Sequence, residues 1–405
     1  MMKPDRVLVG IDVGKSHHVV IQSPDGEIQR ESMSHRQEGF DWLKDQLEEV
    51  SDGDLSRVIV GIEGHNGHLL PLDHYLKQWG CELWNIDAKR LAHFRNVYGT
   101  PCKTDKEDAE LIVHLLSQQT TLFKENDAPY IRVHQPDPKR RQLKRLARHQ
   151  KKMVQAKTRA KNRLKQLLRS HCPDLLDGMG LKSTRFLRAL HQHPSIRGLK
   201  RTSTDGFMAI EGIGEATAQK LKEAVRELSY DRSMDEANAL VIEDLTGLIL
   251  RYQKQIDRLD EQLEELAQDI EAVQWVRSFP GAGIKTACRL VGEIQTIKRF
   301  NSQNALAAYL GVACVDDQSG DHDQARPIYP CNTIGKSAMM DLAHKMSYLD
   351  PESKSYYEKK LDEGKEKLDA KRRVARQLVK ILYRMLTEQR KYDHPDQREG
   401  LKEAA

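Results

Sequence analysis

The chain has 405 residues, enough for roughly two to three domains that each bury a core. Its net charge of +5 conceals many charges of both signs, because 31% of the residues are charged and only 6% aromatic, which favours long charged helices over a β-sandwich. No stretch approaches the ~20 apolar residues that span a bilayer, no signal-peptide run opens the chain, and the six cysteines form no CxxC pair, so we expect a cytoplasmic protein without a membrane partner.

Two β-branched runs separated by a glycine turn open the chain. Residues 7–15 and 17–22, followed by an Asp-Gly turn, predict consecutive antiparallel strands. Asp12 lies within the first run, where a carboxylate is costly to bury unless it is paired or bound to a metal. Asp12 is therefore the first candidate for chemistry.

The following elements predict an α/β domain over residues 1–125. In chain order we expect a strand at 27–35, a helix at 37–50, a buried parallel strand at 57–63, a helix at 68–79, a strand at 81–86 and a helix starting at 103–112. Glu63 ends the parallel strand, and Asp105 and Asp108 share one face of the last helix's first turn. Stabilisation of that helix N-terminus through its dipole is an equally good reading of the last two acids.

A strongly basic helix follows. Between Lys139 and Arg169 there are fourteen Lys or Arg and no Asp or Glu, on a heptad-like apolar stripe. A solvated face is the simple reading, but a solubilising helix normally mixes both signs, so we predict a polyanion partner held through its phosphates. The predicted nucleic-acid contacts of this helix are Lys139, Arg140, Arg141, Lys144, Arg145, Arg148, Lys151, Lys152, Arg159 and Arg163.

A second long helix is acidic. Over residues 242–273 apolar side chains recur in unbroken steps of three and four, which is typical of a coiled coil. We expect it to pack on the basic helix of the same chain or of another subunit, within a region spanning 126–275. Turns at 211–221 and 279–290 resemble the hairpin of a helix-hairpin-helix, whose backbone N–H groups can hold a phosphate; plain helix turns are the alternative.

The C-terminal part is predicted to contain a small, mostly helical unit over 276–348 and a basic helix with a polar tail over 349–405. A loop rich in aspartate and glycine at 315–323 contains Ser319. Taken alone, Ser319 is most simply an ordinary loop serine.

Four acids from three separate elements are predicted to meet at one edge of the sheet. Two-metal sites for phosphoryl transfer need such a set, because several carboxylates must neutralise two divalent ions held ~4 Å apart. The histidines show no spacing with cysteine that would indicate zinc. The predicted ligands of two divalent ions are Asp12, Glu63, Asp105 and Asp108.

Together these motifs resemble the insertion-sequence transposases that join a RuvC-like DEDD domain to a serine transposase domain, a group of RNA-guided recombinases that includes the pilin-gene inversion proteins. The resemblance spans most of the chain. The blocks that resemble the acidic motifs are 10–14, 61–64 and 103–108, and those that resemble the serine domain are 279–287, 299–300, 306–311 and 318–320.

The resemblance implies an RNase H-like N-terminal fold, a helical coiled-coil middle and a mostly α C-terminal domain. It implies a DNA recombinase in which Ser319 is the nucleophile and acts with the Mg²⁺-binding acids in a composite site between subunits of a homodimer or tetramer. It also implies double-stranded DNA as substrate and a structured guide (bridge) RNA, bound by the RuvC-like and coiled-coil parts.

One departure concerns the phosphate contact after Ser319. Where the family commonly has a Gly-Asn and then a Leu-Arg pair, this chain has Gly335-Lys336 and then Met339-Met340. Arg326 and Lys336 are the candidate substitutes for the missing arginine.

Three other functions are compatible with parts of the pattern. A RuvC-like junction nuclease would use the four acids without a covalent intermediate, and a non-enzymatic nucleic-acid-binding coiled coil would need none of them. An actin-like sugar kinase also begins with Gly-Ile-Asp-x-Gly, but the sequence lacks its second glycine-rich phosphate strand and adenosine loop.

Overall fold

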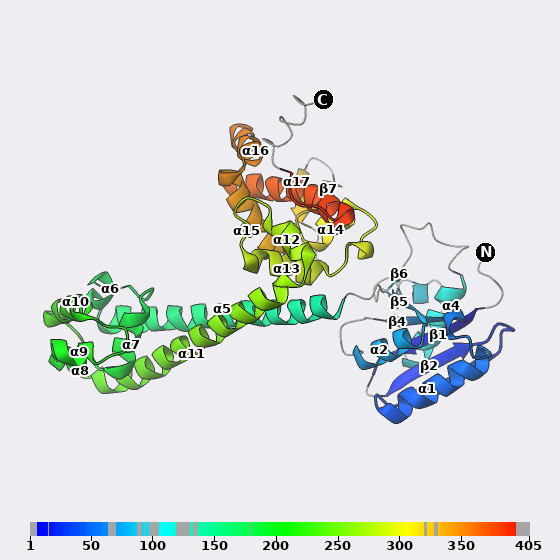
Figure 1. Ribbon diagram of the computed structural model, residues 1–405, viewed down its shortest axis with the longest axis horizontal. Helices are drawn as coiled ribbons and strands as arrows, with labels where there is room; N and C mark the ends of the chain where they lie inside the picture. The colour runs from blue at the N-terminus through cyan, green and yellow to red at the C-terminus, as the bar shows by residue number, and fades with distance from the viewer. Residues whose placement is uncertain are drawn as a thin grey trace. The chain divides into compact units, whose positions relative to one another are not determined.

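The computed structural model describes residues 6–14, 16–63, 70–86, 91–92, 94–96, 105–118, 130–132, 137–178, 180–319, 322–327 and 331–393 (Figure 1). Only the backbone is described at 70, 105–106, 130–132, 177–178, 314–319 and 322–327. The chain forms two compact units, one of residues 1–135 with 298–301 and one of 136–297 with 302–405. None of the helices in the described ranges is long and apolar enough to cross a membrane.

The first unit is built on a six-stranded mixed sheet in the order β3-β2-β1-β4-β5-β6. β1, β2 and β3 form an antiparallel meander, β4 and β5 run parallel to β1, and β6 returns antiparallel to β5. This arrangement is consistent with the RNase H-like prediction. The strands are β1 (Val7–Asp12), β2 (His17–Gln22), β3 (Ile28–Met33), β4 (Val58–Glu63), β5 (Glu82–Ile86) and β6 (Tyr130–Arg132).

Helices cover both faces of this sheet. Val7, Val9 and Ile11 pack with α1 (Gln37–Val50) and α2 (Leu70–Gln78), whereas Leu8 packs with α4 (Asp105–Ser117). A 3₁₀ turn, η1 (Leu55–Arg57), leads into β4. Within the described residues the predicted strands and helices of this domain are confirmed, whereas the predicted helix starts at 68–69 and 103–104 lie outside them. The three-residue strand β6 is an addition that is too short to show a sequence period.

Two glycines let α4 approach the sheet closely. Gly10 on β1 and Gly61 on β4 are partners in the parallel register. A Cβ at Gly10 would overlap the carbonyl oxygen of Ala109, and one at Gly61 would lie 2.5 Å from Cγ2 of Ile112. The face of β1 and β4 under α4 therefore tolerates no side chain at these two positions.

In the second unit two helices of 34 residues, α5 (Pro138–His171) and α11 (Asp235–Gln268), pack along each other. Lys139 pairs with Asp269 at one end (2.7 Å) and His171 with Asp235 at the other (3.2 Å), so the two helices run antiparallel. The acidic helix thus packs on the basic helix of its own chain.

The predicted heptad stripe over 242–273 runs past the end of α11, which is a difference from the sequence prediction. The helix ends at Gln268, because Ile270 adopts an extended backbone (φ −120°, ψ 95°) and α12 (Glu271–Arg277) starts afresh. Ile270 and Val273 remain buried on this new element. The apolar spacing therefore continues across the end of α11, and spacing alone could not have predicted that the helix ends there.

Short helices fill the far end of the α5–α11 hairpin and share a core with it. Ser183, Ser195 and Ser203 each cap one of them by accepting the backbone N–H three residues on, which supplies a partner for a group that the helix leaves unbonded. These helices are α6 (Asp174–Gly178), α7 (Thr184–Gln192), α8 (Ile196–Arg201), α9 (Thr204–Met208) and α10 (Glu215–Arg226).

The C-terminal part of this unit is mostly helical, as predicted. α13 packs on α5 and α15, and α15 packs on α16 and α17. The predicted loop at 315–323 is instead part of an antiparallel hairpin, because a two-residue Gly-Asp connection favours strand pairing on both sides. The elements are α13 (Ile284–Ile294), α14 (Gln303–Tyr309), β7 (Cys314–Ser319), β8 (His322–Pro327), α15 (Thr333–Leu349), α16 (Pro351–Asp362) and α17 (Lys367–Glu388). The 3₁₀ turn η2 (Ile297–Arg299) follows α13, and its last two residues belong to the first unit.

We predict that Gly10→Ala destabilises the first unit by about 1–3 kcal/mol, because the new methyl group must displace helix backbone rather than a flexible side chain. Unfolding can be followed by tryptophan fluorescence, since Trp42, Trp79 and Trp84 belong to this unit and only Trp275 to the other. Gly180→Ala is the matched control, because its Cβ would meet no atom closer than 4.0 Å. Equal stability of the two variants would contradict the tight packing of α4.

Stability of the first unit should also depend on His17, which is 2% exposed and whose Nε2 lies 2.7 Å from Nδ1 of His35. Burial, and then the neighbouring His35 and His18, lower the pKa of His17. The unfolded chain therefore binds a proton more readily, so stability is full above about pH 6.5 and falls as the pH drops below it. The fall should be smaller in His17→Gln; identical pH profiles would show that His17 is not responsible.

Candidate active site

Asp12 and Glu63 end two parallel strands that lie side by side. β1 and β4 pair from Val7 with Val58 to Ile11 with Ile62, so the next pair in this register is Asp12 with Glu63. Paired residues of neighbouring strands lie ~4.8 Å apart and point to the same face. Both acids are half-buried. Two of the predicted ligands therefore meet at the carboxyl edge of the sheet.

The helix α4 brings a third acid to the same face. Asp12 shares the α4 face with Gly10, because side chains alternate along a strand. Asp108 precedes Ala109, the residue that lies against Gly10, and it is 2% exposed. Its Oδ1 accepts a hydrogen bond from Arg95, whose charge offsets the cost of burying the carboxylate. Asp108 is thus held beside the strand that ends on Asp12.

The fourth predicted ligand, Asp105, is described only by its backbone. The backbone of Asp105 opens α4, one turn before Ala109, but its side chain lies outside the described residues. Among the side chains that are described, no three His, Cys, Asp or Glu are grouped as a metal site. Carboxylate oxygens at two adjacent strand ends and on the apposed helix are the donors that Mg²⁺ prefers, and Arg95 holds positive charge at one of them.

Ser319 ends strand β7. Its backbone pairs with that of His322, and the two residues between them form the connection to β8. Arg326 lies on β8 opposite Val315. The side chains of Ser319 and Arg326 lie outside the described residues. The described backbone places Ser319 in the last pair of the hairpin, next to the turn.

A buried carboxylate that sequence reasoning passed over lies near the base of this hairpin. Glu293 on α13 is 1% exposed and accepts hydrogen bonds from Arg148 Nε (2.6 Å), Arg148 Nη2 (2.8 Å) and Asn332 Nδ2 (2.6 Å). Burial by itself would raise the pKa of Glu293, but these hydrogen bonds and the charges of Lys144 and Arg148 hold it below its ordinary value. The sequence signal that could have identified Glu293 is the same as for Asp12, namely an acid within an apolar run.

The cations predicted to bind nucleic acid fall into two sets. One set is engaged within the protein: Lys139 pairs with Asp269, Arg140 donates to the carbonyl of Gln295, Lys144 and Arg148 pair with Glu293, and Lys151 donates to the hydroxyl of Ser337. Lys336, on the first turn of α15, is half-buried beside Gly311. These contacts join α5 to the C-terminal helices.

The other set lies along the outside of α5. Arg145, Lys152 and Arg159 follow one another at seven-residue steps, so they project from the same side of the helix, and all three are exposed. Arg163, one turn beyond, is exposed as well, and Arg141 is half-buried. Within the described residues none of these five side chains has an ion-pair or hydrogen-bond partner in the protein. We call Arg145, Lys152, Arg159 and Arg163 the outer basic stripe.

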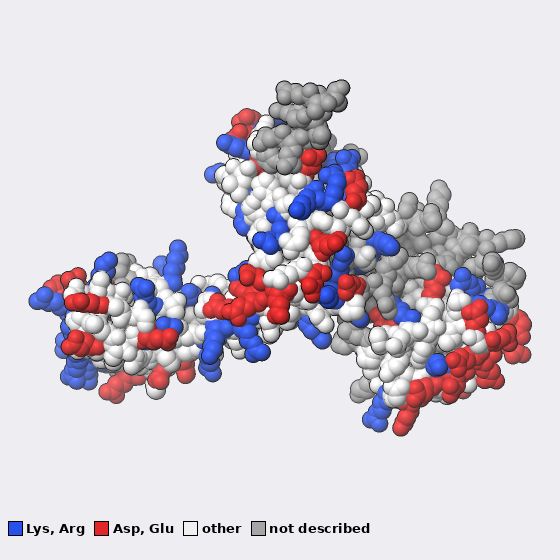
Figure 2. All heavy atoms as spheres, in the orientation of Figure 1, with Lys and Arg blue, Asp and Glu red and all other residues white. Residues whose placement is uncertain are grey.

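Acidic side chains gather elsewhere on the hairpin. Figure 2 shows a red band that follows the C-terminal half of α11, which carries Asp257, Asp260, Glu261, Glu264 and Glu265. The acids are thus concentrated on α11, which also exposes Arg251, Lys254 and Arg258, whereas α5 has no acid between Lys139 and Arg169.

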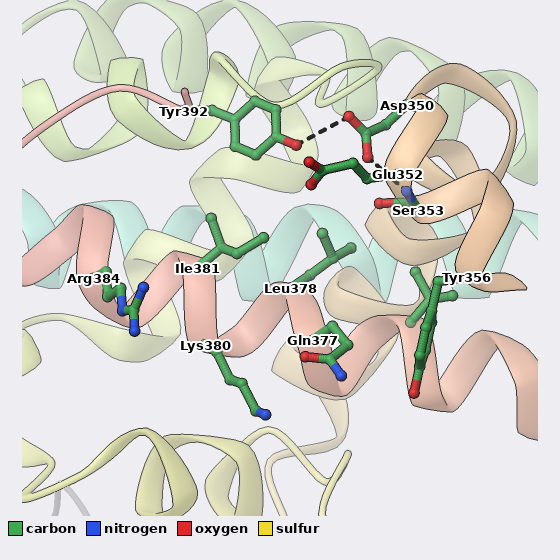
Figure 3. Close-up of a pocket in the computed structure, with 11 residues that line it drawn as sticks. Asp350, Glu352, Ser353, Tyr356, Gln377, Leu378, Lys380, Ile381, Arg384 and Tyr392 are labelled. Atoms are coloured by element: carbon green, nitrogen blue, oxygen red, sulfur yellow. Dashed lines mark hydrogen bonds between the residues drawn. The ribbon is translucent and has the colours of Figure 1, made fainter. Parts of the chain in front are cut away.

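A hollow of about 330 Å³ between α16 and α17 contains none of the predicted site residues (Figure 3). Asp350 at its wall caps α16 by accepting the N–H of Ser353 (2.9 Å) and also accepts the hydroxyl of Tyr392 (3.0 Å). Lys380 and Arg384 lie on α17, across the hollow from these groups (Figure 3). Its buried carboxylate is thus satisfied within the protein.

Comparison with known proteins assigns the family. The model of the IS110 DEDD domain, described as "Transposase", matches residues 9–173, and one described as "Transposase IS116/IS110/IS902 family" matches 273–358. The 44.8 kDa protein of insertion element IS116 from Streptomyces clavuligerus is 25% identical over 95% of this chain and 96% of its own length. The chain belongs to the IS110/IS116 family of transposases. The 43.6 kDa protein of insertion element IS110 from Streptomyces coelicolor is 23% identical over 94% of each.

This family assignment makes the chain a DNA transposase with a DNA recombination function. The first matched region includes Asp12, Glu63, Asp105 and Asp108 together with α5, and the second includes Ser319. Residues 174–272 lie between the two matched regions. They comprise the short helices at the far end of the α5–α11 hairpin and α11 itself.

We predict that the outer basic stripe, rather than the engaged set, determines the salt dependence of DNA binding. Replacing Arg145, Lys152 and Arg159 together by serine should reduce the slope of log K against log salt concentration by about 0.9 for each phosphate that the helix no longer neutralises. Lys139→Ser, which breaks the ion pair with Asp269, is the control and should leave the slope unchanged. An unchanged slope in the triple variant, with helix content intact, would assign binding to another surface.

Proposed function

We propose that this transposase cuts and rejoins DNA strands with Ser319 as nucleophile and with Mg²⁺ held by Asp12, Glu63, Asp105 and Asp108. The observation that carries the proposal is the register of β1 and β4, which places Asp12 beside Glu63 on the face that α4 covers. Structural packing alone gives no reason for carboxylates at two adjacent ends of buried strands.

In the proposed reaction the Ser319 Oγ attacks a phosphorus of the DNA backbone. An Oγ–P bond forms as one P–O bond to deoxyribose breaks, and the released strand end takes up a proton and leaves as a hydroxyl. Attack of another strand's hydroxyl on the phosphoserine reverses these bond changes and restores the serine. No external energy is needed, because the phosphodiester bond energy is kept in the covalent intermediate.

The protein's acids and Arg95 have separate tasks in this scheme. Bound Mg²⁺ supplies charge neutralisation at the phosphate and activation of the hydroxyl. Asp12 and Glu63 would hold the ion from the rigid sheet edge, and Asp105 and Asp108 would hold it from α4. Arg95 orients Asp108 through their hydrogen bond, which supplies a partner for this buried carboxylate.

Double-stranded DNA and a structured RNA encoded by the element are the proposed partners, as the resemblance to RNA-guided recombinases implies. The outer basic stripe supports this part of the proposal, because unpaired cations on one side of a long helix bind phosphates without regard to sequence. Assembly as a homodimer or tetramer is part of the same proposal.

Ser319→Ala should abolish the covalent protein–DNA adduct, and Asp12→Asn should slow adduct formation at least about a hundredfold, because the remaining acids bind the ion less well. Both can be measured with labelled DNA on denaturing gels, with EDTA and added Mg²⁺ to test the metal. Ser170→Ala and Asp25→Asn, both exposed, are the matched controls.

Two outcomes would contradict the proposal. DNA cleavage that persists in Ser319→Ala but requires Asp12 would indicate a RuvC-like nuclease without a covalent intermediate. Recombination that survives Asp12→Asn at the wild-type rate would refute the metal site.

A further inference from the structure

Tyr309 and Asn332 flank the segment 310–331, which contains the β7–β8 hairpin, and they contact each other. The backbone N–H of Asn332 donates to the carbonyl of Tyr309 (2.8 Å), and Asn332 Nδ2 donates to the hydroxyl of Tyr309 (2.7 Å). Tyr309 is the last residue of α14, and Asn332 precedes α15. The segment between them, which contains Ser319, therefore starts and ends at one point.

Glu293 fixes this point to the rest of the unit. Its Oε2 accepts from Asn332 Nδ2 (2.6 Å), and its backbone carbonyl accepts from the hydroxyl of Tyr309 (3.0 Å). The bidentate pair with Arg148 then connects the same carboxylate to α5. One buried acid thus joins α5, α13 and both ends of the hairpin segment.

Stability alone is a poor explanation for this network. Burying an ion pair gains little net stability, because the desolvation of both charges offsets their attraction, and well-packed apolar side chains often do better. α13 and α15 also bury apolar residues of their own, including Leu290, Met339 and Leu342. What a buried network adds is a single allowed geometry.

We propose that Glu293, Tyr309 and Asn332 are positioning residues that set the location of the hairpin carrying Ser319. This inference rests on the proposed nucleophilic role of Ser319. A nucleophile must lie close to in-line with the phosphorus, and a displacement of about 1 Å caused far from the reacting atoms can cost about a hundredfold in rate.

Asn332 performs two tasks that substitutions can separate. Its Oδ1 caps α15 by accepting the N–H groups of Ile334 (3.1 Å) and Gly335 (2.8 Å), whereas its Nδ2 makes the tether to Glu293 and Tyr309. Asn332→Ser keeps a capping oxygen and removes the tether. Tyr309→Phe removes one hydroxyl from the same tether and leaves the cap untouched.

Both variants should bind DNA as tightly as the wild type and form the serine adduct about ten- to a hundredfold more slowly. Amide hydrogen exchange of β7 and β8 should become faster in each, while that of α15 should be unchanged in Tyr309→Phe. Wild-type adduct rates in a folded Asn332→Ser variant, or in Tyr309→Phe if the former does not fold, would overturn the proposal.

In Asn332→Asp, the direction in which the adduct rate changes with pH depends on whether the tether or the cap of Asn332 matters for the reaction. The introduced carboxylate is a good cap but faces Glu293, and the other charged or titratable groups around the pair are Arg148 and Lys144 from α5, Tyr309, Cys331 and Lys336. Two carboxylates in contact bind a shared proton, which restores a hydrogen bond between them. The rate relative to wild type should therefore be low at about pH 8 and recover towards about pH 6.

The opposite pH dependence would overturn the proposal. If Asn332 acts only as a cap, Asn332→Asp should be fully active at about pH 8 and decline as its carboxyl is protonated. Ser319→Ala is assayed in parallel, so that failure of the proposed nucleophile can be distinguished from failure of the proposed positioning network. An adduct that persists in Ser319→Ala refutes the nucleophile, whereas the hydrogen exchange of β7 and β8 in Tyr309→Phe tests the positioning network whether or not Ser319 reacts.

Discussion

A carboxylate that leaves water must meet a cation or several hydrogen-bond donors, and four of the five buried acids among the described residues lie where separate segments of chain meet. Asp108 binds Arg95 beside the sheet edge, and Glu293 joins α13 to α5 and to the serine hairpin. Asp235 accepts from His171 and from the first N–H groups of α8, which ties the far ends of α5 and α11 together. Asp350 holds Tyr392 against the start of α16. Losing any of these acids would leave its donors buried and unsatisfied, so the acids fix geometry more than they add stability.

The charges of the two long helices do not explain why they pack together. Their interface is apolar, with Leu143, Ala147, Leu164 and Leu168 of α5 buried alongside Ile242, Ile249 and Ile256 of α11. Within the described residues, the cations of α5 that do find partners mostly reach α13, α15 and the turn after α13. The helix pair therefore keeps the outer basic stripe on α5 exposed, whereas α11 carries most of the acids of the pair together with the exposed cations Arg251, Lys254 and Arg258.

The parts of the site that were predictable are those governed by local rules. Strand alternation and the cost of a buried charge were enough to single out Asp12 and Glu63, and the register of β1 with β4 then pairs them. Which cations of α5 are engaged was not predictable, because Arg148 and Glu293 lie 145 residues apart and no local pattern encodes their pairing. Glu293 itself carried a readable signal, an acid within an apolar helix, that was overlooked. The hairpin of β7 and β8 was missed because its acidic composition resembles that of a loop, although its Gly-Asp connection is a turn signal.

The order of synthesis gives the α5–α11 hairpin a further consequence. α5 is complete at His171, but its apolar partner α11 ends only at Gln268, so at typical elongation rates α5 waits roughly five to twenty seconds for it. During that interval the nascent chain exposes an apolar stripe and fourteen unpaired cations, none of which can yet meet Glu293 or Asp269. The cations of α5 that pair with Asp269 and Glu293 therefore stay without these partners until synthesis has passed Glu293.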